Sequence, residues 1–439
     1  MRAIQQFRTF NRPVQLLFIN QFAIMIGFSM LMPYLTGYLT TTLGFAAWVA
    51  GLVLGLRTFS QQGLSVIGGT LADHVGYKLV IAGGCILRMA GFLLFAFSDV
   101  LSSVLLAALL TGLGGALFGP AVRAYLASES GERRVEAFAL FQICEGMGAC
   151  LGPVLGVVLF QIGFQLVCVM ASVIFLVLTI LQLCYLPRRE DLKTSAPRPV
   201  WSEWKEVLAN RTFVVFALGM VAYLTLYSQL YLTLPLEVRR LTGNDAGIGI
   251  LFAICALLSI LAQVPITAYL KAHWRPLQAI AMGLTVMGGA FLPLLAARTL
   301  LPIHTLHGAF GDATHMQAVL IGAINLGPAF ASAMLLSLGT MVVHPFALSL
   351  IPSFGGNRLL GTYFGFYYLV QGSGTIVGNL AISSALDTGT TLGLQSLPWL
   401  LLLSLGLASA ASIAALDRKQ MKAHTSGVSR LASMAEASS

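Results

Sequence analysis

The stretch Gly69–Lys78, with the sequence GTLADHVGYK, decides the fold of this chain. An apolar run at residues 48–72 leads into it, and a second at residues 79–97 follows it. So short a polar segment cannot form a domain, but it suits a charged hairpin between two membrane-spanning helices. Gly69 lets a neighbouring helix approach closely, and Gly76 has no Cβ and can take the left-handed conformation that reverses the chain.

Composition supports a membrane protein. The chain is 57% hydrophobic and only 9% charged, whereas soluble domains are about 25% charged. This excludes a soluble globular protein and a disordered one. A helix needs about 20 apolar residues to cross a bilayer. Twelve such runs are present, at residues 14–40, 48–72, 79–97, 101–126, 137–160, 164–186, 212–236, 247–270, 277–300, 317–343, 359–385 and 393–416.

The net charge of +9 follows the expected topology. With the N-terminus inside, 20 of the 25 Lys and Arg residues fall in inner segments and only three in outer ones. This positive-inside bias predicts that both termini are cytoplasmic. The basic balance therefore predicts a bilayer environment and no nucleic-acid partner.

The longest polar interruption divides the chain into two halves. We expect an N-terminal six-helix bundle at residues 1–186, a cytoplasmic linker at 187–211, a C-terminal six-helix bundle at 212–416 and a disordered cytoplasmic tail at 417–439. Two halves of six spans predict a substrate site between them.

Within the linker, four apolar residues lie at helical spacing. They form one face of a short helix at the membrane surface, or else belong to a solvated linker; both interpretations remain open. These residues are Trp201, Trp204, Val207 and Leu208.

No pattern for a metal, a cofactor or an enzyme is found. The six cysteines all lie in apolar runs without a CxxC pair, and no P-loop or HExxH motif is present. The loop residues His304, His307, Asp312 and His315 match no ligand spacing, which favours a solvated loop. We therefore expect no metal and no cofactor.

Glu145 is the only acidic residue deep within a predicted span. It lies about eight residues, or roughly 12 Å, from the cytoplasmic end of its span. A carboxylate there is costly unless it is paired, protonated or facing water. We predict that Glu145 carries a proton; a structural ion-pair role is the alternative.

Arg57 and Arg88 also lie inside spans, each near mid-membrane. Arginine does not readily lose its proton, so neither can carry one. We expect them to be the counter-charges of Glu145, with two other roles open: binding an anionic part of a substrate, or locking helices together. Helix locking is favoured for Arg88, and for Arg57, with Gln61 one turn later, a cavity role is equally open.

Three glycines recur every fourth residue in the string GACLGPVLG and so line one helix face. Gly148, Gly152 and Gly156 predict a close helix contact, and Pro153 predicts a bend. Further polar and aromatic side chains at helical spacing are candidates for a wet cavity or for packing. They are Tyr223, Tyr227, Tyr231, Tyr363, Tyr367 and Gln371, with Asn20 and Gln21 in the first span.

Two of these stretches resemble motifs of a known family. GTLADHVGYK is similar to motif A of the major facilitator superfamily, and GACLGPVLG resembles motif C of its antiporter branch. The chain thus resembles a twelve-span drug/proton antiporter of the bacterial multidrug-resistance exporter type. The resemblance implies an all-α integral membrane protein with twelve transmembrane helices in two six-helix halves, the major facilitator fold.

The resemblance also implies a conformational latch on the inner side. Asp73 would hold the halves together through an arginine and the N-terminal end of the eleventh span. The latch residues on this basis are Gly69, Asp73, Gly76, Lys78 and Arg123. Two departures stand out: Ala108 occupies the position of the family's usual arginine in the fourth span, and Asn20 stands where related exporters often carry an acid.

The resulting hypothesis is a transporter rather than an enzyme. It would export small amphipathic compounds across the bacterial inner membrane by proton-coupled alternating access, as a monomer. Its partners would be a small-molecule substrate, protons and the bilayer. Export of a specific endogenous product, such as a siderophore, lipid or metabolite, is the alternative, and a non-transporting membrane sensor is a further one.

Overall fold

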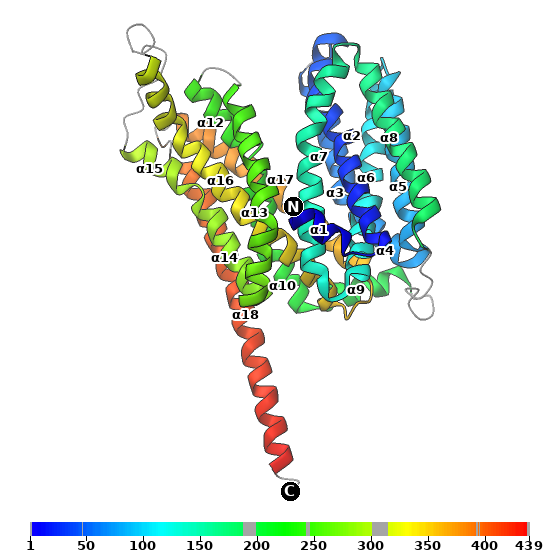
Figure 1. Cartoon of the computed structure of the whole chain (residues 1–439), viewed down its shortest axis with the longest axis vertical. Helices are drawn as coiled ribbons and strands as arrows, with labels where there is room; N and C mark the ends of the chain where they lie inside the picture. The colour runs from blue at the N-terminus through cyan, green and yellow to red at the C-terminus, as the bar shows by residue number, and fades with distance from the viewer. Residues whose placement is uncertain are drawn as a thin grey trace.

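A computed structural model describes residues 2–45, 47–187, 199–242, 246–300, 315–391, 394 and 396–436. Within these ranges the chain is helical and has no β-strand. Two groups of helices, one from each half of the sequence, lie side by side (Figure 1). The linker residues 188–198 and the loop residues His304, His307 and Asp312 lie outside the described residues, as does the side chain of His315.

The first half holds six predicted spans and a short helix before them. The second span is divided into α3 and α4 at Leu64, where the Ser65 hydroxyl group donates to the Gln62 carbonyl oxygen (2.6 Å). The helices are α1 (Arg2–Arg8), α2 (Arg12–Gly37), α3 (Ala47–Gly63), α4 (Ser65–Val75), α5 (Tyr77–Ala96), α6 (Leu101–Ser130), α7 (Arg134–Phe160) and α8 (Phe164–Tyr185), with a π-helical turn at Tyr38–Thr42 and a 3-10 turn at Gly131–Arg133.

The second half holds the other six spans, of which two are interrupted. Its helices are α9 (Val200–Ala209), α10 (Arg211–Gly219), α11 (Val221–Ser228), α12 (Thr233–Thr242), α13 (Ala246–His273), α14 (Pro276–Gly289), α15 (Leu292–Leu300), α16 (His315–Phe354), α17 (Leu360–Thr391) and α18 (Leu397–Glu436). The predicted tail after Asp417 continues as part of α18 to Glu436.

Length and hydropathy alone detect most of these spans. Among the described residues, nine segments are long and apolar enough to cross a membrane, and one of them, Leu101–Phe160, contains both α6 and α7. The divided pair α3 and α4 is not among them, because each piece is short. Neither is α17, which is rich in Gly, Ser, Thr and Tyr. The chain is a multi-pass membrane protein.

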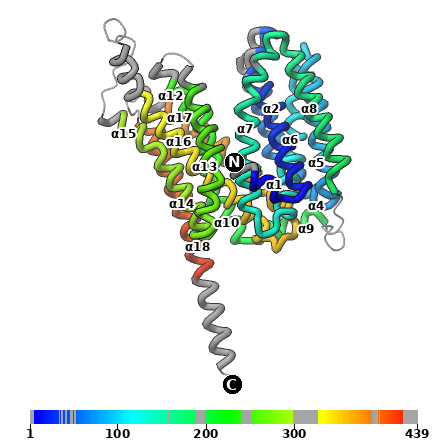
Figure 2. The backbone as a smooth tube through the Cα atoms, in the orientation of Figure 1, coloured from blue at the N-terminus to red at the C-terminus, as the bar shows by residue number. Residues whose placement is uncertain are grey.

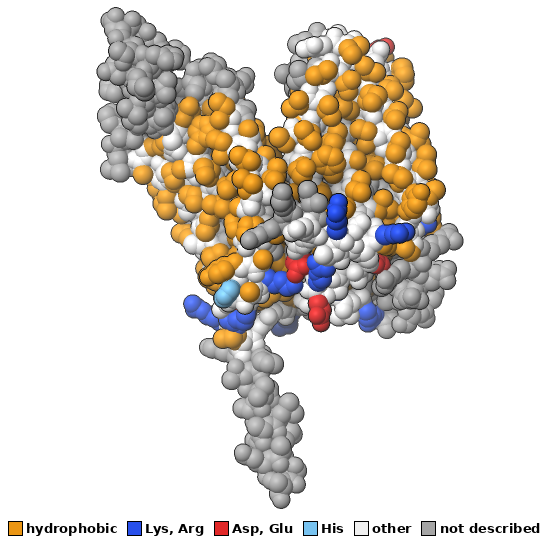
Figure 3. All heavy atoms as spheres, in the orientation of Figure 1, with side chains coloured by type: hydrophobic (Ala, Val, Ile, Leu, Met, Phe, Trp, Pro, Cys, Tyr) orange, Lys and Arg blue, Asp and Glu red, His pale blue; other side chains and the backbone are white. Residues whose placement is uncertain are grey.

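Large apolar side chains on the outer surface face the lipid. Leu79, Ile86 and Leu93 repeat every seven residues along α5 and are all exposed. In the space-filling view apolar side chains cover both halves, while Lys, Arg, Asp and Glu gather at the end from which α18 projects (Figure 3). We call this charged end the closed end, because the halves meet there.

The halves meet through two equivalent helix pairs. α4 packs on α17, and α7 packs on α13 and α16. In span numbers, the second span contacts the eleventh and the fifth contacts the eighth, which is the pattern expected when the second half repeats the first. Away from the closed end the halves separate, and a cleft opens between them (Figure 3).

The linker helix α9 lies against the closed end (Figure 2). Val207 and Glu203 are buried, and Trp204 packs edge-on against the Phe366 ring (5.9 Å between centroids). Trp201 and Leu208, which we expected on the same face, are exposed. The helix is present, but the face that contacts the protein contains a carboxylate as well as apolar groups.

Candidate functional site

At the closed end, Asp73 caps the first turn of α17. Its carboxylate accepts hydrogen bonds from the backbone N–H groups of Gly361 (2.8 Å) and Thr362 (2.7 Å) and from the Thr362 hydroxyl (2.8 Å). The Tyr77 hydroxyl donates a further bond (2.8 Å). A negative charge at a helix N-terminus satisfies its free N–H groups and is favoured by the helix dipole. Asp73 thus joins the first half to the second.

The same crossing is close because two glycines face each other. A Cβ atom built on Gly69 would collide with the Gly361 carbonyl oxygen, and a Cβ on Gly361 would collide with Gly69. The helices α4 and α17 therefore touch backbone to backbone. Gly76 follows α4 with a φ of 103°, the left-handed region that its place in the hairpin predicts, and Lys78 lies half-buried at the start of α5.

Further polar contacts join the halves around this crossing. Lys271 of α13 contacts Glu136 of α7 (Nζ to Oε1, 2.8 Å), and Arg134 donates to the Asn357 side chain (2.7 Å). The Trp204 indole N–H of α9 donates to the Thr70 hydroxyl (2.9 Å). The closed end is thus held by contacts from α4, α7 and α9 together.

Glu145 and Arg123 form an ion pair in the interior, between α7 and α6. The guanidinium Nη2 lies 3.9 Å from the Glu145 Oε2. The Arg123 guanidinium also lies over the ring of Tyr368, which belongs to the second half (4.9 Å). Although Glu145 is deep in the molecule, its side chain is 32% exposed.

The ion pair borders the second half, because the Arg123 guanidinium lies 4.9 Å from the centroid of the Tyr368 ring of α17. The Oε2 atom of Glu145 is buried and has no hydrogen-bond partner among the described residues. A partly exposed carboxylate deep in the molecule is a candidate for binding and releasing a proton.

This arrangement differs from two expectations. Arg123, rather than Arg57 or Arg88, is the cation beside Glu145 among the described residues. Likewise, the described partners of Asp73 are Tyr77 and the start of α17, whereas Arg123 lies beside Glu145. The reason is depth: Arg123 is two turns before the end of the long helix α6, so its side chain reaches the interior rather than the surface.

An aromatic wall from the second half lines the side of the cleft opposite the ion pair. The rings of Tyr223 and Tyr227 stack (6.4 Å between centroids), and the hydroxyl groups of Tyr227 and Tyr231 lie 3.2 Å apart. The His344 ring stacks on Tyr223 (6.2 Å between centroids). These rings offer flat apolar surfaces with polar edges, which suit amphipathic molecules.

The remaining candidates divide between the interior and the closed end. Tyr367 is buried beside Tyr368, and Gln371, one turn further along α17, has no hydrogen-bond partner for its buried side chain among the described residues. Tyr363 instead lies at the closed end, where its hydroxyl accepts from Asn210 (3.2 Å). Asn20 is buried inside the first half, where its carbonyl accepts from Gln182 (2.9 Å).

The glycine face of α7 packs on α2. A Cβ on Gly148 would lie 2.5 Å from the Phe22 carbonyl oxygen, and one on Gly152 would lie 2.7 Å from the Ser29 Cβ. Gly156 is equally close to Met30. The Pro153 carbonyl oxygen accepts from the Tyr34 hydroxyl (2.8 Å). These contacts fix α7, and with it Glu145, against the first half.

Arg57 and Arg88 lie together inside the first half. Arg57 of α3 donates to the Gln61 side chain (2.7 Å), and its guanidinium lies 4.3 Å from the Phe28 ring centroid. Arg88 of α5 lies 5.9 Å from the same ring. The position of the family's usual arginine, Ala108, is fully buried nearby on α6.

Sequence patterns do not indicate two of the side chains near the ion pair. His344 lies within α16, one residue past the predicted end of its span, and Tyr368 follows Tyr367 on a face that periodicity did not select. A histidine at the edge of an apolar run is a weak signal, and only the packing of α17 against α6 brings Tyr368 to Arg123.

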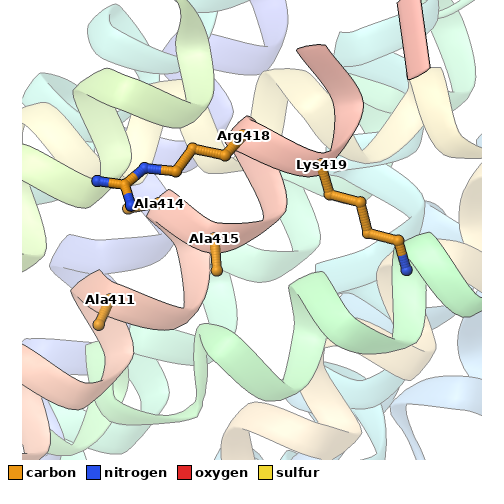
Figure 4. Close-up of a pocket in the computed structure, with 5 residues that line it drawn as sticks. All are labelled: Ala411, Ala414, Ala415, Arg418 and Lys419. Carbon is orange, nitrogen blue, oxygen red and sulfur yellow. The ribbon is translucent and has the colours of Figure 1, made fainter. Parts of the chain in front are cut away.

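A second hollow lies outside the cleft, on the surface of α18. It has a volume of about 400 Å³ and is lined by small side chains and two cations, Ala411, Ala414, Ala415, Arg418 and Lys419 (Figure 4). The Arg418 and Lys419 side chains point in different directions, so they do not converge on one point (Figure 4). Nearby, Arg275 pairs with Asp417 (2.9 Å) and joins α14 to α18.

Known proteins resemble this chain over nearly its whole length. A sequence model described as the Major Facilitator Superfamily matches residues 17–379. An uncharacterized MFS-type transporter of Mycobacterium tuberculosis is 38% identical over 94% of both chains. The multidrug resistance protein MdtH of Salmonella arizonae is 30% identical over 88% of this chain and 89% of its own.

A solved structure shares the fold. That of the human organic anion transporter TETRAN aligns with a TM-score of 0.66 at 16% identity, over 92% of this chain and 99% of the other. The helix order, the paired contacts between the halves and the similarity to these relatives all support the same family assignment. The chain therefore belongs to the Major Facilitator Superfamily, a family of transporters rather than enzymes.

Proposed function

We propose that this chain exports small amphipathic compounds by alternating access, with protons moving in the opposite direction. The observation that carries the proposal is the Glu145–Arg123 pair, a deep and partly exposed carboxylate whose arginine lies against the Tyr368 ring of the other half. The relatives named multidrug resistance protein MdtH support the substrate class.

The proposed cycle uses the two protonation states of Glu145. When the cleft faces outward, a substrate leaves and Glu145 takes a proton from outside. Loss of the carboxylate charge weakens the attraction between Glu145 and Arg123, which leaves Arg123 in contact with the rings of Tyr368 and Phe141 and with the Gly119 carbonyl oxygen. The closed end opens, a substrate enters from the inner side, and the proton leaves inward. Binding and proton release are thereby coupled through one carboxylate.

The membrane placement belongs to the same proposal. The charged closed end would face the cytoplasm of a bacterial cell, with both termini on that side, because Lys and Arg concentrate there. The structure would then be open to the outside, with Asp73 and the surrounding contacts as the inner latch. The transporter would act as a monomer.

The test uses purified protein in liposomes that contain a pH-sensitive dye. Cationic, neutral and anionic amphiphiles are added under an imposed proton gradient, and the native protein is compared with Glu145→Gln. Glu132→Gln is the matched control, since Glu132 is an exposed carboxylate in the turn before α7. We expect substrate-dependent proton movement in the native protein and the control but not in Glu145→Gln.

The other possible results of this experiment would each support a different function or a different proton site. Proton movement that persists in Glu145→Gln would assign the proton to another group, with His344 the next candidate. If no amphiphile moves protons through the native protein, the drug-export proposal fails. Export of one endogenous product would then be the better account, or a sensor if no compound is moved at all.

A further inference from the structure

The interior of the first half contains more positive charge than its acids can balance. Arg57 and Arg88 are close enough to interact electrostatically, and Arg88 is only 7% exposed. Among the described residues, neither guanidinium has a carboxylate within ion-pair distance, and the Nε of each has no hydrogen-bond partner. Glu145 is paired with Arg123, and Asp73 caps α17.

A buried charge without a partner costs free energy of folding, and an uncharged side chain at the same position would avoid that cost. The protein supplies only partial compensation. The Gln61 carbonyl oxygen accepts from Arg57, and the Phe28 ring lies near both guanidinium groups. An amide dipole and a ring face stabilise cations weakly compared with an anion. Both arginines therefore keep free N–H donors available for an acceptor.

Aromatic rings flank Arg88, since the ring centroids of Phe28, Phe118 and Phe175 lie 5.9, 5.8 and 5.8 Å from its guanidinium, whereas α6 presents a small residue to the cluster. Gly115 of α6 faces it, and a Cβ there would lie 2.7 Å from the Arg88 Nη2 and 2.8 Å from the Gln61 side chain. Arg57 and Phe28 are partly exposed. An acceptor that enters along Phe28 could thus reach Arg57, with Arg88 behind it.

We propose that Arg57 and Arg88 form a binding site for the negatively charged group of an exported amphiphile, such as a carboxylate, sulfonate or phosphate. The planar donor fork of arginine matches the two oxygens of such a group. The Phe28 ring would contact the adjoining apolar part of the ligand. This inference rests on one part of the proposed function, namely that the substrate binds in the cleft.

The test is an equilibrium binding measurement without any proton gradient. The full-length protein is embedded in nanodiscs of uncharged lipid, and binding of radiolabelled 1-naphthoate is compared with that of its methyl ester, which has the same ring system but no charge. The variants are Arg57→Gln, Arg88→Gln and Arg57→Lys. The matched control is Arg211→Gln, an exposed arginine at the start of α10.

We expect native protein to prefer the carboxylate to the ester. Arg57→Gln and Arg88→Gln should weaken carboxylate binding about tenfold or more, which corresponds to about 1.4 kcal/mol, and leave ester binding unchanged. Arg57→Lys should lie between, because it keeps the charge but loses the fork. Removing either unpaired cation should not lower the unfolding temperature measured without ligand, whereas loss of a structural contact would lower it.

Three results would overturn the proposal. One is equal weakening of carboxylate and ester binding in Arg57→Gln and Arg88→Gln. Another is failure of the native protein to prefer the carboxylate. The third is complete displacement of bound naphthoate by chloride at millimolar concentration, which would make the cluster an inorganic anion site.

Glu145→Gln separates this inference from the proposed function. In that variant carboxylate binding should persist, because the anion site does not include Glu145. If proton coupling fails its test while the carboxylate preference depends on Arg57, the anion site stands alone. If Glu145→Gln loses proton coupling but Arg57→Gln keeps its carboxylate preference, only the present inference fails.

Discussion

The hydroxyl group and the backbone N–H of Thr362 both donate to one carboxylate oxygen of Asp73, at 2.8 and 2.7 Å. This double contact crosses from one half of the transporter to the other. Because it involves a full charge and a helix N-terminus, its loss should shift the balance between the two ends by about 1–3 kcal/mol.

The first prediction therefore concerns Asp73→Asn. We expect the closed end to open in a larger fraction of molecules. Spin labels at Glu132→Cys and Ala272→Cys, one on each half, measure this as a longer distance, with the exposed native cysteines Cys150 and Cys184 replaced by serine. Thr362→Val removes the hydroxyl but keeps the N–H, so it should have a smaller effect. An unchanged distance distribution in Asp73→Asn would contradict the latch role.

The second prediction concerns the glycine crossing. Gly69→Ala places a methyl group against the Gly361 carbonyl oxygen, and neither backbone can move without parting the helices. We expect the same labels to report a longer distance between the halves at the closed end. Transport should fall at least tenfold. Gly83→Ala is the control, because no atom lies within 4 Å of its added Cβ. Normal transport by Gly69→Ala would show that the close approach is dispensable.

The third prediction concerns the ion pair between Lys271 and Glu136. Both side chains are partly exposed, so the pair should contribute only about 0.2–1 kcal/mol and should weaken as salt rises. We expect Lys271→Gln to change the label distances slightly at low ionic strength and not at all at high ionic strength. An effect as large as that of Asp73→Asn would assign the main latch to this pair instead.

The fourth prediction concerns Arg123. Arg123→Gln leaves Glu145 deep in the molecule without its cation, and the carboxylate should then hold its proton more firmly. We expect substrate binding to persist while the pH at which transport is half-maximal shifts upward. Arg123→Lys keeps the charge and should restore part of the native pH profile. An identical profile in Arg123→Gln would mean that the pair does not tune the proton site.

The fifth prediction concerns the packing of α7 on α2. Gly152→Ala adds a methyl group 2.7 Å from the Ser29 Cβ, so we expect a loss of about 1–3 kcal/mol of stability, seen as a lower unfolding temperature. Gly146→Ala meets no atom within 4 Å and replaces a poor helix former, so its unfolding temperature should not fall. Equal unfolding temperatures for the two variants would rule out a tight seam at Gly152.

Local patterns foretold the elements of the fold but not the contacts between distant side chains. The apolar runs, the charged hairpin and the glycine spacing predicted the spans, the left-handed turn at Gly76 and the close faces of α4 and α7. The partner of Glu145 was beyond reach, because sequence depth alone cannot tell which of three arginines a helix rotation will bring near. For the same reason Asn20 and Tyr363, polar residues in apolar runs, suggested a cavity although neither lies in the cleft.

The linker helix α9 contacts both halves of the protein. α9 is bound to α4 through Trp204 and Thr70, and to α17 through the Trp204–Phe366 ring contact. If the halves separate at that end during the proposed transport cycle, a segment bound to both of them must lose one of these two sets of contacts. The contact of α9 with the two halves would then form and break once in each cycle, and a stronger contact would slow the opening step.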